Sequence, residues 1–198
     1  ANLLRKGLFA LTHRPDLSLV RDRMRNAGKL REISTPLADA LRLSPSVLPR
    51  LHYVEHHPSH LASAFFVSPF DSAAVCAIDG FGDFVSTSMA MGRGNRLELL
   101  DKVYFPHSLG MLYTAVTQHL GFLGYGDEFK VMGLAPYGKP EFVREIRKLV
   151  TLQKRGKFEL SLDYFRHWSG GVEMEWSDGY PTLGVVYSPL LERLLGPA

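Results

Sequence analysis

The middle of the chain alternates between short apolar runs and glycine-rich breaks. An apolar, β-prone run covers residues 73–78, residues 85–91 alternate apolar and polar positions, and a third run covers residues 97–104. The breaks between them, residues 79–83 and 92–96, are rich in the Gly, Asp and Asn residues that favour turns. The pattern predicts three consecutive antiparallel strands joined by tight turns, the first of them buried on both faces.

Helical periodicity prevails on both sides of these strands. The clearest case is residues 108–120, where Ser108 is a suitable N-cap and Gly121 a suitable stop. Because helices and strands alternate in blocks, the sequence predicts a mixed α/β fold. The other predicted elements are helices from Pro15 to Gly28, from Pro58, after Pro140 and after Pro189, strands over residues 51–54 and 157–162, and a polar loop over residues 124–130.

Composition narrows the class of protein. The 198 residues are 45% hydrophobic and 22% charged, which is typical of a globular domain and excludes a wholly disordered chain. No apolar run is long enough for a transmembrane helix, and no secretory leader is visible, so we expect no membrane association. Cys76 stands alone inside an apolar run, which indicates a buried, unreactive thiol and a reducing, cytoplasmic setting.

The charge is distributed unevenly. Residues 1–50 hold ten Lys or Arg against four Asp or Glu, a balance of +6, whereas the remainder holds 13 against 16, a balance of −3. A basic arm can meet nucleic acid, but this one contains a single aromatic residue, Phe9, and offers no stacking platform for bases. We therefore interpret residues 1–50 as a helical lead-in with a solvated basic face.

Three histidines form the most distinctive cluster of the sequence. His56 and His60 are four residues apart, and His57 and His60 are three apart, so either pair would share one face of a helix. This is the spacing at which two imidazoles bind one metal ion. A catalytic metal needs at least a third protein ligand, and none is obvious nearby in sequence. Solvated or capping histidines are the alternative interpretation.

Two glycine-rich segments are candidate nucleotide contacts. In the first, Asp79, Gly80 and Gly82 follow the first predicted strand, where successive N–H groups can form an anion nest and the acid can orient a metal or hydroxyl. In the second, Glu128 and Lys130 precede a glycine-containing turn and could serve a nucleotide. A plain hairpin turn and a solvated surface are the respective alternatives.

Together the segments YVEHHPSHLASAFFVSPFDSAAVCAIDGFGDFVSTSMAMGRGN, FPHSLGMLYTAVTQHLGF and GDEFKVMGLAPYGKPEF resemble the NodU/TobZ-type O-carbamoyltransferases, in order from about residue 53 to 142. The resemblance implies a transferase domain related to the tRNA threonylcarbamoyl-transferases. The predicted three-strand meander followed by helices is itself similar to one half of the actin-like ATPase and sugar-kinase architecture. A YrdC-like domain of the family makes carbamoyl-adenylate from carbamoyl phosphate and ATP, and the transferase domain passes the carbamoyl group to a hydroxyl of a small metabolite.

The resemblance also implies roles for the singled-out residues. His56 and His60 become ligands of a divalent metal, iron rather than zinc, with His57 and Asp79 as catalytic neighbours. The nucleotide contacts become Asp79, Gly80, Gly82, Glu128 and Lys130. The family has a serine-glycine pair where Gly126 and Asp127 stand, which affects the expected nucleotide contacts.

The family has further segments that this sequence does not match. An opening strand, a later aspartate ligand and the YrdC-like domain are all missing, so we expect residues 51–198 to be the metal- and nucleotide-site core of a larger enzyme and to be inactive alone. The acceptor and the oligomeric state stay open. A tRNA-modifying transferase and a non-catalytic metal- or anion-binding module are the alternatives, with nucleic acid disfavoured as a partner.

Overall fold

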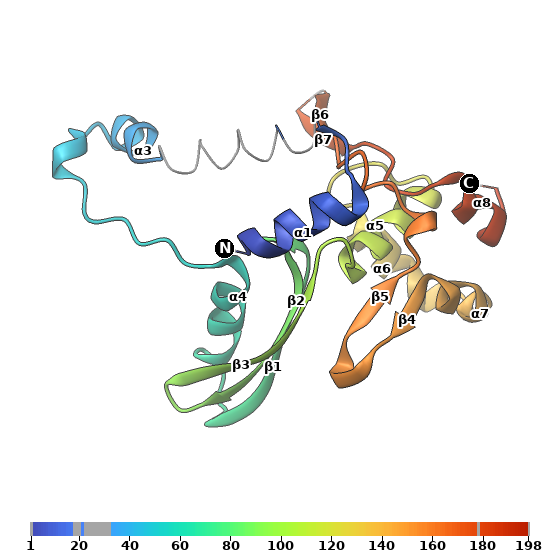
Figure 1. Ribbon diagram of the computed structural model, residues 1–198, viewed down its shortest axis with the longest axis horizontal. Helices are drawn as coiled ribbons and strands as arrows, with labels where there is room; N and C mark the ends of the chain where they lie inside the picture. Colours follow the sequence, from blue (N-terminus) through green and yellow to red (C-terminus); the bar gives the residue numbers. More distant parts are fainter. Residues whose placement is uncertain (1, 18–20, 22–32, 178, 198) are drawn as a thin grey trace.

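A computed structural model describes residues 2–17, 21, 33–177 and 179–197 (Figure 1). Its central feature is an antiparallel sheet in the order β1–β2–β3. The strands are β1 (Ser72–Gly82), β2 (Val85–Arg93) and β3 (Arg96–Tyr104). The predicted three-strand meander is therefore confirmed, and helices before and after it give the expected α/β class.

The connection between β1 and β2 differs from the prediction. The turn consists of Asp83 and Phe84, both in the left-handed region with φ of 53° and 73°. Ile78 pairs with Thr87 and Gly82 with Val85, so the three intervening residues of β1 interrupt the regular register. Asp79 thus lies at an irregularity within the strand rather than in the turn, and such irregularities can re-aim a side chain.

Helix α4 (His56–Phe65) covers one face of the sheet. Leu61 packs on Ala77 and Ala90 in a small apolar cluster. Over residues 74–78 the opposite face of β1 is not covered by the described residues: Ile78 is 58% exposed, and Cys76 is also exposed. The predictions that β1 is buried on both faces and that Cys76 is buried are therefore wrong, because over residues 73–78 only α4 among the described elements packs on this strand, whereas α5 contacts its last residues.

The largest core lies beyond the sheet, around α5 (Leu109–His119). Met111 and Ala115 of this helix pack with Leu149, Phe165 and Leu191, which come from the last third of the chain. The elements that follow α5 are α6 (Glu128–Leu134), η2 (Ala135–Tyr137), α7 (Val143–Ile146), η3 (Arg147–Leu149), β4 (Val150–Leu152), η4 (Lys154–Gly156), β5 (Phe158–Leu160), η5 (Leu162–Tyr164), β6 (Met174–Ser177), β7 (Tyr180–Leu183) and α8 (Pro189–Leu195).

Most predicted helices are present, with shifted ends. Ser108 caps α5 as expected, and Ser188 caps α8, since each side-chain oxygen accepts from a backbone N–H. Helix α4 begins two residues before Pro58, α6 occupies the end of the predicted 124–130 loop, and the helix after Pro140 is short. The two-stranded pairs β4–β5 and β6–β7 were foreseen only in part, as a strand near residues 157–162.

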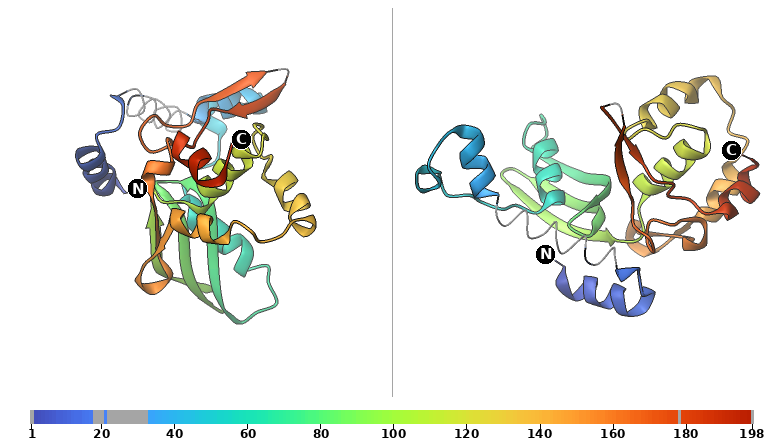
Figure 2. Two further views of the ribbon diagram at one scale, coloured as in Figure 1. Left: turned by 90° about the vertical axis from the view of Figure 1, so that its right-hand side faces the viewer. Right: turned by 90° about the horizontal axis from the view of Figure 1, so that it is seen from above.

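The N-terminal part contains α1 (Leu3–His13), α3 (Ser34–Leu41) and η1 (Pro45–Val47). Helix α1 docks through Phe9, whose ring meets Phe84 and Phe105 edge-on, while α3 stands apart from the sheet (Figures 1 and 2). Residues 51–54 are irregular, so the predicted strand is wrong there: no described strand lies beside them to pair with. The predicted 15–28 helix lies largely outside the described residues. None of the helices that the structure describes has the length and hydropathy to cross a bilayer.

A buried histidine predicts how stability depends on pH. His167 is 1% exposed, and its Nε2 lies 2.8 Å from the Pro106 carbonyl oxygen. Burial lowers the pKa of His167 from 6.5 to about 4. Because the unfolded chain then binds the extra proton more readily, stability is fully present above pH 6.5 and is lost as the pH falls toward about 4.

We expect this residue alone to remove up to about 3 kcal/mol of unfolding free energy across that interval. The measurement is the urea unfolding free energy of the wild type and of His167→Gln at several pH values from 7.5 to 4. Glutamine can still donate to the Pro106 carbonyl but does not titrate. Parallel pH dependences for the two proteins would contradict the assignment.

Candidate functional site

The histidine cluster opens helix α4. His56 is the first residue of the helix, and its backbone N–H donates to Asp83 Oδ2 at 2.9 Å. The turn between β1 and β2 thereby caps the helix from outside, because the preceding residue, Glu55, provides no side-chain cap. Pro58 sits in the first turn, where a missing N–H costs little. The cluster is consequently fixed to the end of the β1–β2 hairpin.

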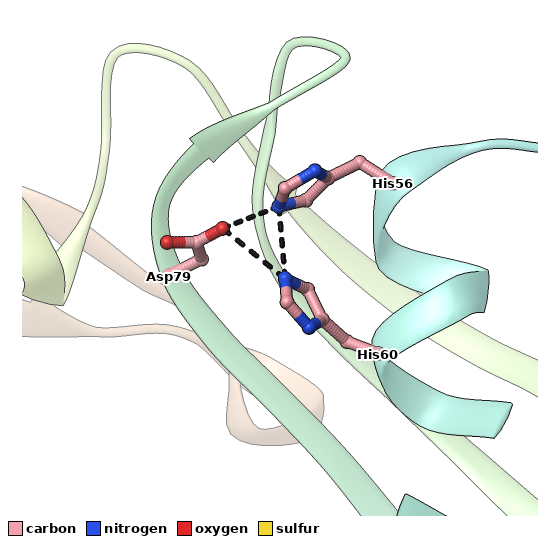
Figure 3. Close-up of side chains that lie close together, drawn as sticks. All are labelled: His56, His60 and Asp79. Carbon is pink, nitrogen blue, oxygen red and sulfur yellow. Dashed lines mark hydrogen bonds and ion pairs between the residues drawn. The ribbon is translucent and has the colours of Figure 1, made fainter. Parts of the chain in front are cut away.

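His56, His60 and Asp79 point toward one another (Figure 3). His56 Nε2 lies 2.6 Å from Asp79 Oδ2 and 2.9 Å from His60 Nε2, and His60 Nε2 lies 3.6 Å from the same carboxylate oxygen. Ligand atoms bound about 2.1 Å from one ion lie about 3.0–3.4 Å apart in octahedral or tetrahedral geometry. The three atoms therefore fit a single divalent ion with only small adjustments.

The structure separates His57 from this triad. The His57 ring is 1% exposed, and its Nε2 lies 3.0 Å from the Val85 carbonyl oxygen on β2. Burial lowers the pKa of His57, which keeps the ring neutral. Of the two histidine pairs that the spacing allowed, only His56 and His60 converge, and His57 packs between helix and sheet instead.

Asp79 is held from behind by the start of helix α5. Ser108 Oγ donates to the Asp79 carbonyl oxygen at 2.9 Å and accepts from the Met111 N–H at 3.1 Å. Gly110 lies so close that a Cβ there would stand 2.7 Å from Gly80 N and 2.8 Å from the Asp79 carbonyl group. The absence of a side chain at Gly110 thus lets the helix rest directly on the backbone that carries Asp79.

A second glycine makes room for the first histidine. A Cβ on Gly82 would lie 2.0 Å from the His56 ring, so the imidazole occupies the space that any side chain at this position would take. We expected Gly82 and Gly80 to offer backbone donors to a phosphate. The Gly80 N–H instead donates to Asp79 Oδ1 at 2.6 Å, which orients the carboxylate.

The electrostatics of Asp79 favour the carboxylate form. Partial burial raises its pKa, but hydrogen bonds from His56 and from the Gly80 N–H outweigh that effect and leave the pKa below its ordinary value. The side chains of His56, His60 and Asp79 are 43%, 52% and 36% exposed, so a bound ion would have open positions on the solvent side. An open coordination position is what distinguishes catalytic from structural metal sites.

Glu128 and Lys130 stand at the beginning of α6 rather than in the triad. Glu128 Oε1 accepts from Thr114 Oγ1 at 2.5 Å, and Thr114 lies one turn after Gly110 on α5. Lys130 forms an ion pair of 2.7 Å with Asp127. Helix α5 is therefore the link between the two predicted parts of the site, since it touches Asp79 at its start and Glu128 further along.

Asp127 has a role that the sequence did not predict. Its side chain is buried, and besides Lys130 it accepts from the Gly124 N–H at 2.9 Å and from the Tyr180 hydroxyl at 2.8 Å. The bond with Lys130, and then those with Tyr180 and Gly124, lower the pKa of Asp127. An acid directly before a helix was a visible signal, but its partner Tyr180 is 53 residues away.

A sequence model described as the carbamoyltransferase N-terminus matches residues 27–178, which is well over half of the chain. The chain belongs to the carbamoyltransferase family. The resemblance stated from the motifs is thereby confirmed at the level of the family, and the matched range includes the histidine triad and the α6 segment.

Three curated relatives share substantial identity with this carbamoyltransferase chain. Over 62% of this chain, it is 49% identical to the uncharacterized protein sll1178 of Synechocystis. Over 58% of this chain, it is 41% identical to the nodulation protein NolNO of Sinorhizobium fredii. Over 56% of this chain, it is 44% identical to the nodulation protein NolO of Bradyrhizobium diazoefficiens. The aligned regions span 20%, 17% and 20% of these relatives, so the matched part of the chain covers about a fifth of their length.

Proposed function

We propose that the chain supplies the metal-binding part of an enzyme that transfers a carbamoyl group from carbamoyl-adenylate to a hydroxyl of a small metabolite. Family membership supports the reaction class. The observation that carries the proposal is the convergence of His56 Nε2, His60 Nε2 and Asp79 Oδ2 within 4.8 Å of one another. Two imidazoles and one carboxylate with open positions suit both ferrous iron and catalytic zinc, and we propose iron because the family resemblance favours it.

Each residue of the triad would have a distinct task. A bound divalent ion supplies Lewis acidity, which an unreactive carbonyl and a weakly acidic hydroxyl both need. His56 and His60 bind that ion through Nε2, and the rigid helix α4 keeps their spacing. Asp79 provides the anionic ligand, and its carboxylate is kept ionised and oriented by the Gly80 N–H. Ser108 and Gly110 hold the Asp79 backbone in place.

We place the nucleotide next to the same site. Glu128 is ordered by Thr114, and Lys130 is ordered by the buried Asp127, so both side chains have fixed positions from which to contact carbamoyl-adenylate. The three-stranded meander followed by helices supports a domain of the actin-like ATPase and sugar-kinase type. We further propose that residues 51–198 are the site-bearing core, that carbamoyl phosphate and ATP are consumed upstream, and that the enzyme works in the cytoplasm.

The test is a transfer assay on a full-length protein that contains this chain. The assay starts from pre-formed carbamoyl-adenylate and offers hydroxylated acceptors such as sugars and aminoglycosides, with tRNA as a separate arm. We expect transfer to a small acceptor and a fall of about 100-fold or more in His60→Ala, or about 3 kcal/mol in the barrier. His52→Ala is the matched control, because His52 is exposed and lies outside the triad.

Three results would contradict the proposal. Transfer to tRNA alone would assign the chain to the threonylcarbamoyl branch. Equal rates for His60→Ala and His52→Ala would remove the triad from the reaction. Absence of transfer to every acceptor, in a protein that still binds metal, would favour a non-catalytic binding module.

A further inference from the structure

A separate cleft opens between helix α1, the end of β3 and the β4–β5 hairpin. Its volume is about 590 Å³, within the range of small-molecule sites. Phe9, Val103, Phe105 and Phe158 contribute the apolar part of its lining. None of the triad residues lines the cleft, so its contents are independent of the proposed metal centre.

The charge of the cleft is strongly positive. Five cationic side chains and two carboxylates line it, which gives a formal balance of +3. Lys102 is paired outside the cleft with Glu55 at 3.1 Å, which leaves +2. The cationic residues are Arg5, Lys102, Lys154, Arg155 and Lys157, and the acidic ones are Asp101 and Glu159.

Two of these cations share one carboxylate. Arg155 Nε and Lys157 Nζ lie 3.4 Å and 3.6 Å from the two oxygens of Asp101. One negative charge cannot neutralise both, so the hairpin keeps a surplus of positive charge toward the cleft. The Asp101 carboxylate also holds the two long side chains near one another, which lowers the entropy lost when they bind an anion.

His107 adds a neutral donor to this wall. Its Nδ1 accepts from the Leu160 N–H at 3.0 Å, so Nδ1 carries no proton and the neutral ring must carry its proton on Nε2. Among the described residues, no hydrogen bond uses that Nε2–H. The atom is also not fully buried, so solvent or a ligand can reach it. His107 therefore offers an accessible donor of fixed tautomer from the lining of the cleft.

Helix α1 closes the opposite side with a cation fixed on an aromatic ring. The Arg5 guanidinium lies 3.8 Å above the centroid of Tyr104, and the His13 ring stacks on Phe9 at 4.6 Å. Stacking leaves the guanidinium edges free to donate in the plane of the group, which is the geometry that suits phosphate oxygens. Flat ring surfaces beside the cations suit the less polar body of a metabolite.

We propose that this cleft binds a phosphate monoester of a small metabolite. A phosphate monoester carries about two negative charges at pH 7, which matches the uncompensated charge of the cleft better than a single carboxylate does. Lys157 and Arg155 contact the phosphate from the hairpin, His107 Nε2–H donates to it from the same wall, and the apolar lining holds the organic part.

Isothermal titration of the chain with glucose 6-phosphate, inorganic phosphate and glucose tests the proposal. We expect glucose 6-phosphate to bind at least tenfold more tightly than glucose, and inorganic phosphate to compete with it. Lys157→Gln should weaken binding of glucose 6-phosphate at least fivefold. His107→Asn should do the same, because Asn can still accept from the Leu160 N–H but lacks the Nε2 donor.

Lys148→Gln is the matched control. It removes the same charge as Lys157→Gln, but Lys148 is exposed and does not line the cleft. It should bind like the wild type. Equal affinity for glucose and glucose 6-phosphate would overturn the proposal. Unchanged binding of glucose 6-phosphate in Lys157→Gln, a surface variant that does not threaten folding, would also overturn it. Loss of binding in Lys130→Gln instead would overturn it too, because the phosphate would then lie beside α6.

Discussion

Gly110→Ala is expected to destabilise the chain by about 1–3 kcal/mol and to weaken divalent metal binding at least tenfold. An added methyl group would stand 2.7–2.8 Å from backbone atoms of Asp79 and Gly80. Backbone cannot swing aside as a flexible side chain can, so α5 and β1 must move apart, and overpacking of this kind typically costs that amount. The movement displaces Asp79 from His56 and His60, because Ser108 and Gly110 fix its position.

Gly133→Ala is the control for this experiment. Gly133 also lies in a helix, α6, but nothing stands within 4 Å of the Cβ that it would gain. Alanine there should be neutral or stabilising by up to about 1 kcal/mol through helix propensity alone. The measurements are urea unfolding and metal titration on both variants. If Gly110→Ala behaved like Gly133→Ala in either measurement, α5 would not be the support of Asp79.

The sequence was most informative where one local pattern sufficed. The alternation of apolar and polar residues and the glycine turns predicted the meander. Ser108 predicted the start of α5, because N-capping involves residues only three apart. The histidine spacing likewise gave the two imidazoles of the triad. The choice between His56 and His57 depended on which side of α4 faces β2, and the structure decides that by burying His57 against Val85.

The parts that the sequence could not predict depend on contacts between distant segments. Asp79 was expected at a turn, but the two-residue turn forms at Asp83 and Phe84, so the register moves Asp79 into the strand and toward α4. The partnership of Asp127 with Tyr180 needs the β6–β7 pair, whose strands had no clear pattern. The apolar character of residues 73–78 was misleading for the same reason, because it does not tell how many layers cover a strand.

Asp79→Asn is expected to lower the affinity of the chain for ferrous or zinc ion by about 100-fold or more, with little change in fold stability. Asparagine removes the anionic ligand, the strongest of the three for a divalent cation. Loss of a residue that only orients a ligand already lowers metal affinity about 10–100-fold, so loss of the ligand itself should lower it at least as much. The amide oxygen can still accept from the Gly80 N–H, so the metal-free unfolding free energy should stay within about 0.5 kcal/mol. Competition with a chromophoric chelator measures the affinity, and urea unfolding of the metal-free protein measures the stability.

Asp71→Asn provides the control, because it makes the same change of charge at an exposed acid immediately before the same strand. It should bind metal like the wild type. A parallel titration with AMP separates the two roles considered for Asp79. Normal metal affinity in Asp79→Asn together with weaker AMP binding would make Asp79 a nucleotide contact and leave His56 and His60 as the only protein ligands of the triad. Loss of metal with unchanged AMP binding is the result we expect, since Asp79 Oδ2 faces the two imidazoles at 2.6 Å and 3.6 Å.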